Sequence, residues 1–319
     1  MYSLIIVDYN SIIKTVEYID RCMDAMGSEG VSHVVIVQNG DASSDKAVLT
    51  DRFGEPKQRF LEAPQKNVLV FEKENQTVVY CPAGENLGYA KGNNLAAVIA
   101  AEFWGDPYYI ISNNDLEFPE KLDLQISDKL FREDPQIGAI GPQVVTPQGD
   151  IQSPRYWIGP GKKLIASYWI NCLSGLFGER FRNKMYNKFG RDIVFDAASG
   201  YYAWISGCFM ILRAKAFHEA GMFDENTFLY AEEPILAKRL EQIQSRVYFC
   251  RELKVIHAHG ATTTNNLKMM RMITIDFESN QYLYKTYMHT SSFVLACSKV
   301  SFRLYKWMVG AKSRLTGRA

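Results

Sequence analysis

Short apolar runs alternate with helix-like segments through the first half of the chain, and this alternation constrains the fold more than any other feature. Apolar runs rich in β-branched residues predict buried strands at 3–8, 33–39, 67–71, 77–81 and 107–112. Apolar residues at helical spacing predict helices at 11–26, 84–103 and 119–133, and the polar stretch 41–66 is expected to hold a short helix and a loop. Strands that alternate with helices are typical of an α/β fold, so we expect a mixed, mainly parallel sheet flanked by helices.

The second half continues this pattern and then becomes helical. A hairpin is predicted over 137–152, a strand over 204–213, helices over 214–220 and 231–244, and short strands over 246–250 and 254–260. Two helices are predicted to follow, over 265–289 and 292–311. We therefore divide the chain into an α/β domain, 1–260, and a C-terminal helical extension, 261–319. Within the domain, 155–191 is rich in basic and aromatic residues and is interpreted as an inserted segment.

Charge is balanced overall but uneven along the chain. The formal net charge is +1, so no global field favours a nucleic-acid partner, and none is expected. Seven basic residues and no acidic residue follow Glu278, which indicates an anionic partner for the tail. Six cysteines are scattered without a CxxC pair, which fits a reducing compartment and no zinc site. Neither a signal peptide nor a membrane-spanning apolar run is recognised, so a cytoplasmic location is expected.

Four polar clusters carry the chemistry. Carboxylates at i and i+2 in Asn113-Asn114-Asp115-Leu116-Glu117 follow a predicted strand, where they can bind a divalent cation or form an Asx turn. The segment 85–94, ENLGYAKGNN, places glycines before a helix, although neither the GxGxxG nor the GxxxxGK[ST] fingerprint is present. Adjacent Glu232 and Glu233 at a helix start suit a general base or simply the helix N-terminus. His257 and His259 point to one side of a strand, as metal ligands or as structural groups.

Taken together and in this order, these clusters resemble one family, the inverting family 2 glycosyltransferases of GT-A fold, in their rhamnosyltransferase-like branch. The resemblance covers about residues 3–290. It rests on ENLGYAKGNN, ISNNDLEF, SGCFMILR, AGMFDEN, FLYAEEPILAKRL and VIHAHG, with GDIQSPRYW as a weaker match.

The resemblance implies a role for each matching residue. The nucleotide-sugar donor would be bound by residues at the strand ends and helix start, namely Val7, Asp8, Tyr9, Asn39, Asn86, Gly88, Lys91, Asn94, Asn113 and Asn114. Mg²⁺ or Mn²⁺ would be held by Asp115, Glu117 and His257, and Glu233 would be the catalytic base beside Glu232. The chain departs from the family pattern at Gln38, where the family has an aspartate. Either Asp41 or Asp45 is a candidate to replace it.

The implied reaction is metal-dependent transfer of a sugar, with dTDP-rhamnose favoured as donor, to a saccharide or lipid-linked saccharide acceptor in surface polysaccharide synthesis. Two alternatives stay open. A sugar nucleotidyltransferase would carry a Gly-rich basic loop after the first strand, where this chain has Asp8-Tyr9-Asn10-Ser11. A catalytically inactive sugar-nucleotide-binding subunit is supported only by Gln38 and Glu233.

The sequence patterns of two segments suggest binding partners for them. The inserted segment 155–191 is either a lid or acceptor surface, with Lys162, Lys163, Arg180 and Arg182 facing an anionic acceptor, or a structural helical hairpin. In 292–318, Lys299, Arg303 and Lys306 share one helix face beside apolar Val300, Leu304, Trp307, Met308 and Ala311. This pattern is typical of a helix lying on the inner, anionic face of a cell membrane, and equally of a helix packed on the domain or on a second subunit of a homo-oligomer.

Overall fold

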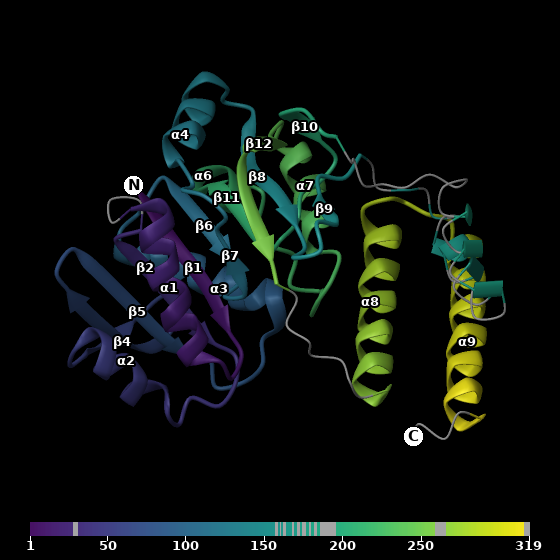
Figure 1. Ribbon diagram of the computed structural model, residues 1–319, viewed down its shortest axis with the longest axis horizontal. Helices are drawn as coiled ribbons and strands as arrows, with labels where there is room; N and C mark the ends of the chain where they lie inside the picture. Colours follow the sequence, from purple (N-terminus) through teal and green to yellow (C-terminus); the bar gives the residue numbers. More distant parts are fainter. Residues whose placement is uncertain are drawn as a thin grey trace.

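One twisted sheet forms the centre of the molecule in this computed structural model (Figure 1). The structure describes residues 1–27, 31–156, shorter stretches and single residues between 159 and 185, then 196–258 and 266–315. Most of the segment 155–191, including Lys162, Lys163 and Arg182, lies outside these residues, as do His259 and the last four residues of the tail.

Twelve strands within the described part of the chain belong to this sheet. The first seven are β1 (Tyr2–Asp8), β2 (His33–Gln38), β3 (Lys57–Leu61), β4 (Lys66–Lys73), β5 (Gln76–Pro82), β6 (Tyr108–Ser112) and β7 (Leu116–Glu117). The other five are β8 (Ile137–Val145), β9 (Ile151–Ser153), β10 (Gly200–Tyr202), β11 (Phe209–Arg213) and β12 (Arg246–His257). The main path of the sheet is β10-β12-β8-β11-β6-β1-β2-β5-β4-β3, with β7 beside β12 and β9 beside β8.

Parallel pairing places the ends of the central strands at one edge of the sheet. β1 pairs in parallel with β2 and with β6, β2 with β5, and β8 with β12. β11 runs antiparallel between β6 and β8, so β8 and β12 point the same way as β1. The carboxyl ends of β1, β2, β6 and β12 therefore lie at one edge, which is where ligands bind in sheets of this kind.

Helices cover both faces because alternate side chains of the buried strands point to opposite faces. One face packs on α1 (Ile12–Met26), α2 (Asp45–Phe53) and α4 (Leu124–Glu133). The other packs on α3 (Gly88–Phe103), α6 (Ala214–Glu219) and α7 (Glu232–Gln242). Each face forms its own apolar cluster, with Ile6 and Ile36 in the first and Ile5 and Val35 in the second. The expected α/β architecture, a mixed sheet between helices, is confirmed.

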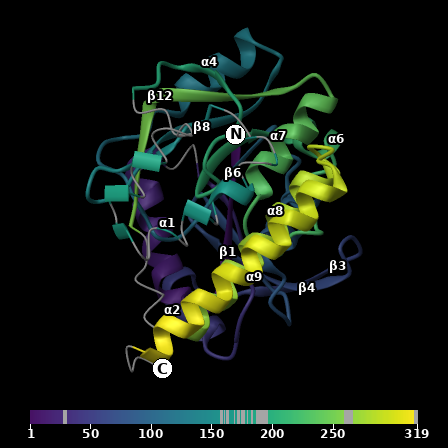
Figure 2. The same ribbon diagram turned by 90° about the vertical axis from the view of Figure 1, so that its right-hand side faces the viewer.

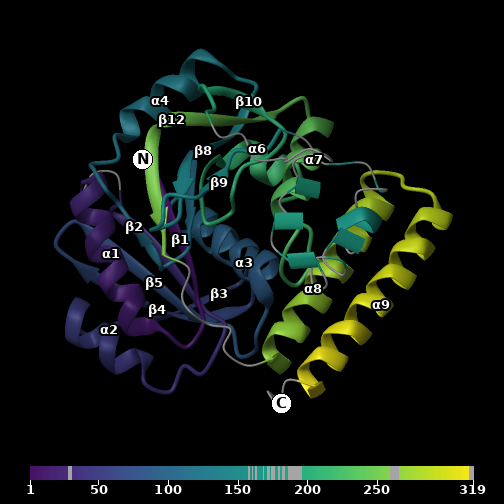
Figure 3. The same ribbon diagram turned by 45° about the vertical axis from the view of Figure 1, so that its right-hand side comes forward.

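The C-terminal extension is a pair of helices, α8 (Asn266–Thr286) and α9 (Ser292–Leu315). Figures 1 and 3 show α8 between the α/β domain and α9. The rings of Phe277 and Phe302 stack at 4.0 Å between centroids and join the two helices. Among the described residues, no helix combines the length and apolar character that a membrane-spanning helix needs.

The outer face of α9 is uncovered (Figure 2). Trp307 is 71% exposed and Val300 is 55% exposed, and Phe293 and Leu304 are exposed as well. Lys299, Arg303 and Lys306 lie on the same exposed part of the helix. Three residues of the apolar stripe recognised in the sequence, Val300, Leu304 and Trp307, therefore do not pack on the α/β domain.

Most element boundaries lie within a few residues of those predicted, and three expectations were wrong. The two short strands expected at 246–250 and 254–260 are one strand, β12, whose register shifts between Cys250 and Lys254. The polar stretch 41–66 also contains β3, which pairs with β4 although its side chains are mostly exposed. Residues 204–208 precede β11 rather than belong to it. These errors arise because edge strands and irregular strand segments lack the apolar alternation that reveals a strand.

Candidate active site

Asp8, at the end of β1, is the centre of a buried hydrogen-bond network. Its carboxylate accepts bonds from the Ser11 and Thr15 hydroxyls, each at 2.6 Å, and from the Ser11 backbone N–H at 3.0 Å. The Asn114 side-chain amide also donates to it, at 3.0 Å. Asp8 thereby joins the ends of β1 and β6 to the start of α1. Of the residues expected at the donor site, Asp8 and Asn114 are in direct contact with each other.

Gln38 lies between two buried carboxylates. Its side-chain amide donates to Asp8 at 2.8 Å and to Asp45 at 2.5 Å, and its oxygen accepts from the Gly40 backbone N–H at 2.9 Å. Asp45 also accepts a bond from the Tyr80 hydroxyl at 2.7 Å and is 2% exposed. The amide separates two acids that would otherwise repel each other. A glutamine therefore fits between the two acids at position 38, and Asp45 is fully used inside this network. Asp41 lies on the exposed surface nearby.

Asn39 and Gly88 bring the end of β2 against the start of α3. The Asn39 side-chain amide donates to the Gly88 carbonyl at 2.9 Å, and its Oδ1 is buried without a hydrogen-bond partner. Gly88 has a φ of 75°, and a Cβ there would lie 2.3 Å from the Phe228 carbonyl oxygen. Both the backbone angle and the close approach require glycine. The unpaired Asn39 oxygen is a buried acceptor available to a ligand donor.

The other residues expected at the donor site differ in exposure. Tyr9 and Lys91 are exposed, as is Asn86, whose side chain accepts a bond from the Gly88 N–H at 3.0 Å. Asn94 is buried and bonds both the N–H and the carbonyl of Phe223, at 3.0 and 2.9 Å. Val7 and Asn113 are intermediate in exposure. Asn94 is thus bonded to the loop that precedes α7.

Asp115 and His257 are paired across the strand ends. Asp115 Oδ1 lies 3.4 Å from His257 Nε2, and His257 Nδ1 lies 3.0 Å from the Gln152 side-chain oxygen. Burial lowers the pKa of His257, but its hydrogen bonds to Asp115 and Cys208 outweigh burial and raise it to about 10. Glu117 is exposed on β7, which pairs with β12 at His257.

These residues are compatible with a divalent cation held partly by substrate. No group of three or more His, Cys, Asp or Glu side chains gathers in metal-ligand geometry within the described ranges. Mg²⁺ commonly takes one or two protein carboxylates and completes its shell with phosphate oxygens and water. Asp115 supplies that limited set, and His257 beside it would join it in its neutral form.

Glu232 and Glu233 begin α7, next to Ala231 at a φ of 66°. Glu233 Oε1 accepts a bond from the Gly207 backbone N–H at 3.0 Å, and burial raises its pKa despite this bond and the positive charge of Arg155. Glu232 is 3% exposed, with Oε1 unpaired. Burial and the charge of Glu233 raise the pKa of Glu232 to about 8. Two adjacent carboxyls, one buried and one partly accessible, therefore lie where a proton is easily held.

The segment before β11 holds site residues to which the motifs had assigned no role. Gly207 donates to Glu233, and its carbonyl accepts a bond from the Tyr89 hydroxyl at 2.6 Å. A Cβ on Gly207 would lie 2.7 Å from Glu233 Oε1, so this position favours glycine. The sequence signal for these residues was the motif SGC directly before a strand. Their place in the site becomes clear only because β11 lies beside β6.

Helix α8 and the turn that follows it are hydrogen-bonded to the loop that leads to the two glutamates. The hydroxyls of Tyr282, on α8, and of Tyr287, directly after α8, donate to Asp224, at 2.9 and 2.5 Å, and Ser279 donates to the Leu229 carbonyl at 2.7 Å. Asp276 on the same helix has a pKa that burial raises to about 6, and its charge further raises that of Glu232. The first helix of the extension thus contributes to the surroundings of the glutamate pair.

The fold of the described residues is of the GT-A type. A solved structure described as the crystal structure of GalNAc-T7 with UDP, GalNAc and Mn²⁺ matches with a TM-score of 0.55. That match has 11% identity and covers 99% of this chain and 57% of the other. It establishes the fold alone. No family model matches the chain.

The curated relatives agree with this class. Two proteins, from the CDC 1551 / Oshkosh and ATCC 25618 / H37Rv strains of Mycobacterium tuberculosis, are each named N-acetylglucosaminyl-diphospho-decaprenol L-rhamnosyltransferase. Each is 27% identical over 191 residues, which span 57% of this chain and 59% of the relative. The resemblance to rhamnosyltransferases of GT-A fold that the motifs indicated is therefore confirmed.

Proposed function

We propose that this chain is a metal-dependent inverting glycosyltransferase that moves a sugar from a nucleoside diphosphate to an acceptor hydroxyl. The observation that carries the proposal is the pairing of Asp115 with His257 at one edge of the sheet, beside the segment Gly207-Cys208, which bonds Glu233 through Gly207 and His257 through Cys208. Asp115, His257 and Glu233 lie at the ends of β6 and β12 and at the start of α7, which is the expected place for donor diphosphate and acceptor to meet.

The donor half of the site lies at the ends of β1 and β2 and at the start of α3. Asn39 offers an unpaired buried oxygen, and Lys91 offers an exposed cation one turn into α3. Asp115 and His257 would hold Mg²⁺ or Mn²⁺, which would stabilise the negative charge on the leaving diphosphate. Glu117 is exposed beside them, as a ligand of secondary importance.

Glu233 is proposed as the base because it is partly accessible, whereas Glu232 is buried. The Gly207 N–H orients one of its carboxylate oxygens. The base takes the proton of the acceptor hydroxyl as that oxygen bonds to the anomeric carbon. The bond from that carbon to the diphosphate oxygen breaks with its electron pair, and the configuration inverts. Glu232 is the adjacent buried carboxyl, and the charge of Glu233 helps to raise its pKa.

The donor, the acceptor and the location are supported by the name of the relatives and by the positive charge of α9. The relatives' name makes a rhamnosyl donor and a lipid-linked diphosphate acceptor the first choices to test. We place the enzyme at the cytoplasmic face of a membrane, since the exposed α9 face combines Trp307 with three cations. We keep the division into a catalytic domain, 1–260, and a helical extension, with 155–191 as the acceptor-side segment.

The direct test incubates the full chain with a panel of nucleotide sugars that includes dTDP-rhamnose, with Mn²⁺ or with EDTA. Release of nucleoside diphosphate that needs both Mn²⁺ and an acceptor supports the proposal. Release of pyrophosphate from a nucleoside triphosphate and a sugar phosphate would instead identify a nucleotidyltransferase. Binding of a nucleotide sugar without any turnover would identify an inactive subunit.

A further inference from the structure

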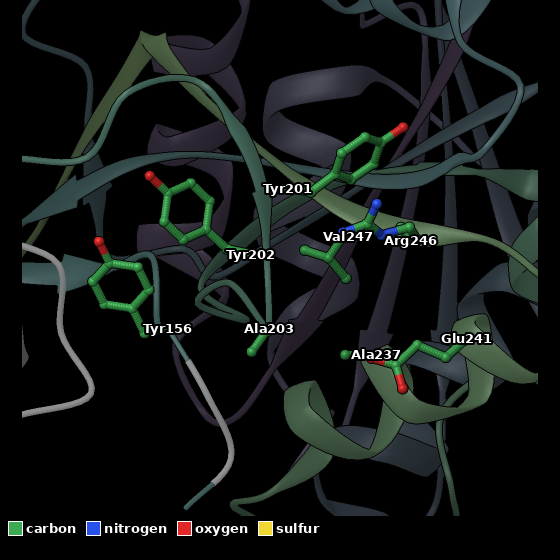
Figure 4. A pocket seen from close by; sticks show the side chains of 8 residues that line it. All are labelled: Tyr156, Tyr201, Tyr202, Ala203, Ala237, Glu241, Arg246 and Val247. Atoms are coloured by element: carbon green, nitrogen blue, oxygen red, sulfur yellow. The ribbon is translucent and has the colours of Figure 1, made fainter.

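A pocket lined by tyrosines lies between β10 and α7, outside the site described above (Figure 4). Its volume is about 220 Å³. This is smaller than the ~300–1,000 Å³ typical of pockets for drug-sized ligands. We call it the tyrosine pocket and define it by Tyr156, Tyr201, Tyr202, Ala237, Glu241 and Arg246.

The walls combine the aromatic rings of Tyr156 and Tyr202 with the carboxylate of Glu241. The rings of Tyr156 and Tyr202 lie 5.9 Å apart and are tilted by 49°, and Tyr156 is 63% exposed. Figure 4 shows Tyr156 and Tyr202 on one side and Glu241, from α7, on the other. The guanidinium of Arg246 lies 3.9 Å from the Tyr201 ring centre, and the Tyr201 hydroxyl donates to Asp134, so both side chains are occupied toward the face that carries α4.

This lining favours an uncharged ligand rich in hydroxyls. Glu241 is paired with Lys238 at 2.7 Å, so its charge is balanced and neither a phosphate nor a cation is favoured overall. The Tyr156 hydroxyl and the Glu241 carboxylate also disfavour a purely apolar ligand. A sugar ring has an apolar C–H face that suits a tyrosine ring and a polar edge that suits a carboxylate.

The pocket is connected to the proposed base by two short paths. Ala237 lies four residues after Glu233 on α7 and Glu241 eight residues after it, so all three share a face, ~6 and ~12 Å along the helix. Arg155, whose charge lowers the pKa of Glu233, directly precedes Tyr156. The backbone of Arg155 pairs with Trp204 and Ala203, which holds Tyr156 near β10.

We propose that the tyrosine pocket is a subsite for a neutral sugar unit of the acceptor, beyond the unit that receives the transferred sugar. The proposal rests on the proposed function for the identity of its ligand as acceptor. The pocket would align the acceptor hydroxyl with Glu233 by holding a sugar one to two helical turns away. This assigns specificity for the acceptor to residues that take no part in donor binding.

The test is saturation-transfer NMR on the full chain with rhamnose, glucose, galactose, mannose, N-acetylglucosamine and the disaccharide chitobiose. We expect at least one sugar to receive saturation at its ring C–H protons. The variants Tyr156→Ala and Glu241→Gln should weaken that binding by roughly 2- to 12-fold, the effect of losing one aromatic or polar contact. Phe60→Ala is the matched control, since Phe60 is 54% exposed on β3 at the opposite end of the sheet.

Each outcome separates this inference from the proposed function. If no sugar binds in a way that depends on Tyr156 or Glu241, the subsite is refuted, even if nucleotide sugars are consumed. If binding depends on both residues but no donor is ever consumed, the pocket is a carbohydrate site and the glycosyltransferase proposal fails. The Glu233→Gln variant should retain this sugar binding. If that variant loses the binding, the sugar is held at the proposed base and not in the tyrosine pocket.

Discussion

The backbone N–H of Gly207 donates a hydrogen bond to Oε1 of Glu233, at 3.0 Å, and so joins the approach to β11 with the start of α7. This bond holds one oxygen of a carboxylate that is only partly accessible to solvent. Burial raises the pKa of Glu233, and the N–H bond limits that rise because it favours the charged form. A carboxylate held in this way is both oriented and basic, as a general base must be.

Replacing Glu233 by glutamine should keep the shape of the site and remove its ability to accept a proton. We expect transfer to fall by ~10²–10⁴-fold, with nucleotide-sugar affinity nearly unchanged. Transfer rate and donor binding should be measured on the same preparation. Glu219→Gln, at an exposed position on α6, is the control and should behave as the original chain. Full activity of Glu233→Gln, with loss in Glu232→Gln, would move the base by one residue.

Replacing Asp115 by asparagine should weaken the binding of Mn²⁺ and slow transfer by at least ~100-fold, since metal stabilisation of a leaving group contributes several kcal/mol. The melting temperature should hardly change, because Asp115 is 35% exposed and outside the apolar core. Calorimetric titration with Mn²⁺ and the nucleoside diphosphate gives a readout independent of turnover. Asp150→Asn, on an exposed turn, is the control. Unchanged Mn²⁺ affinity in Asp115→Asn would exclude this residue as a ligand.

The raised pKa of Glu232 predicts a stability that falls with pH. Its pKa is about 8 in the folded chain, against 4.5 as the ordinary value. The folded state therefore binds this proton more tightly, so the stabilisation is complete below about pH 4.5 and is lost as the pH rises through about 8. Glu232→Gln removes this loss.

The melting temperature of Glu232→Gln, relative to the original chain, should thus rise by several degrees between about pH 5 and about pH 8.5. Scanning calorimetry at both values measures it. The exposed Glu219→Gln should show the same difference at both. A difference for Glu232→Gln that does not vary with pH would mean that this carboxyl is ionised normally.

Two glycines with similar backbone angles separate the effect of strain from that of crowding. Gly88 has a φ of 75° and Gly84 a φ of 83°, but a Cβ meets the Phe228 carbonyl only at Gly88. Gly84→Ala should lower the free energy of unfolding by ~1–2 kcal/mol. Gly88→Ala should cost ~1–3 kcal/mol more, because Phe228 must move. Urea unfolding of both variants measures the difference, and equal losses would refute the close contact.

The exposed face of α9 predicts binding to anionic vesicles. The full chain should pellet with vesicles of phosphatidylcholine and phosphatidylglycerol at low salt, and should be released by high salt, because each cation near the surface contributes ~1 kcal/mol. Trp307→Glu should abolish pelleting, and Phe60→Glu, on β3, should not. Vesicle-independent dimers that Trp307→Glu dissociates would assign this face to a second copy of the chain instead.

Local patterns were enough to predict the central strands and most of the polar clusters at their ends. Asp115 and His257 are 142 positions apart, yet both could be placed at one edge because parallel strands end together. The contacts that depend on packing between distant elements could not be predicted. Nothing in the local sequence indicates that Tyr282 and Tyr287 bond to Asp224, because that requires the position of α8. The same reason hid the tyrosine pocket, which joins β10, β12 and α7.

The amide of Gln38 has a consequence for how related sequences can diverge. It neutralises no charge, but it keeps Asp8 and Asp45 apart by donating one N–H to each. An aspartate or glutamate at position 38 would place a third acid in the same buried corner, with no donor between them. Positions 38 and 45 are therefore expected to change together across relatives: an acid at 38 should accompany the loss of the acid at 45, and an amide at 38 should accompany its presence.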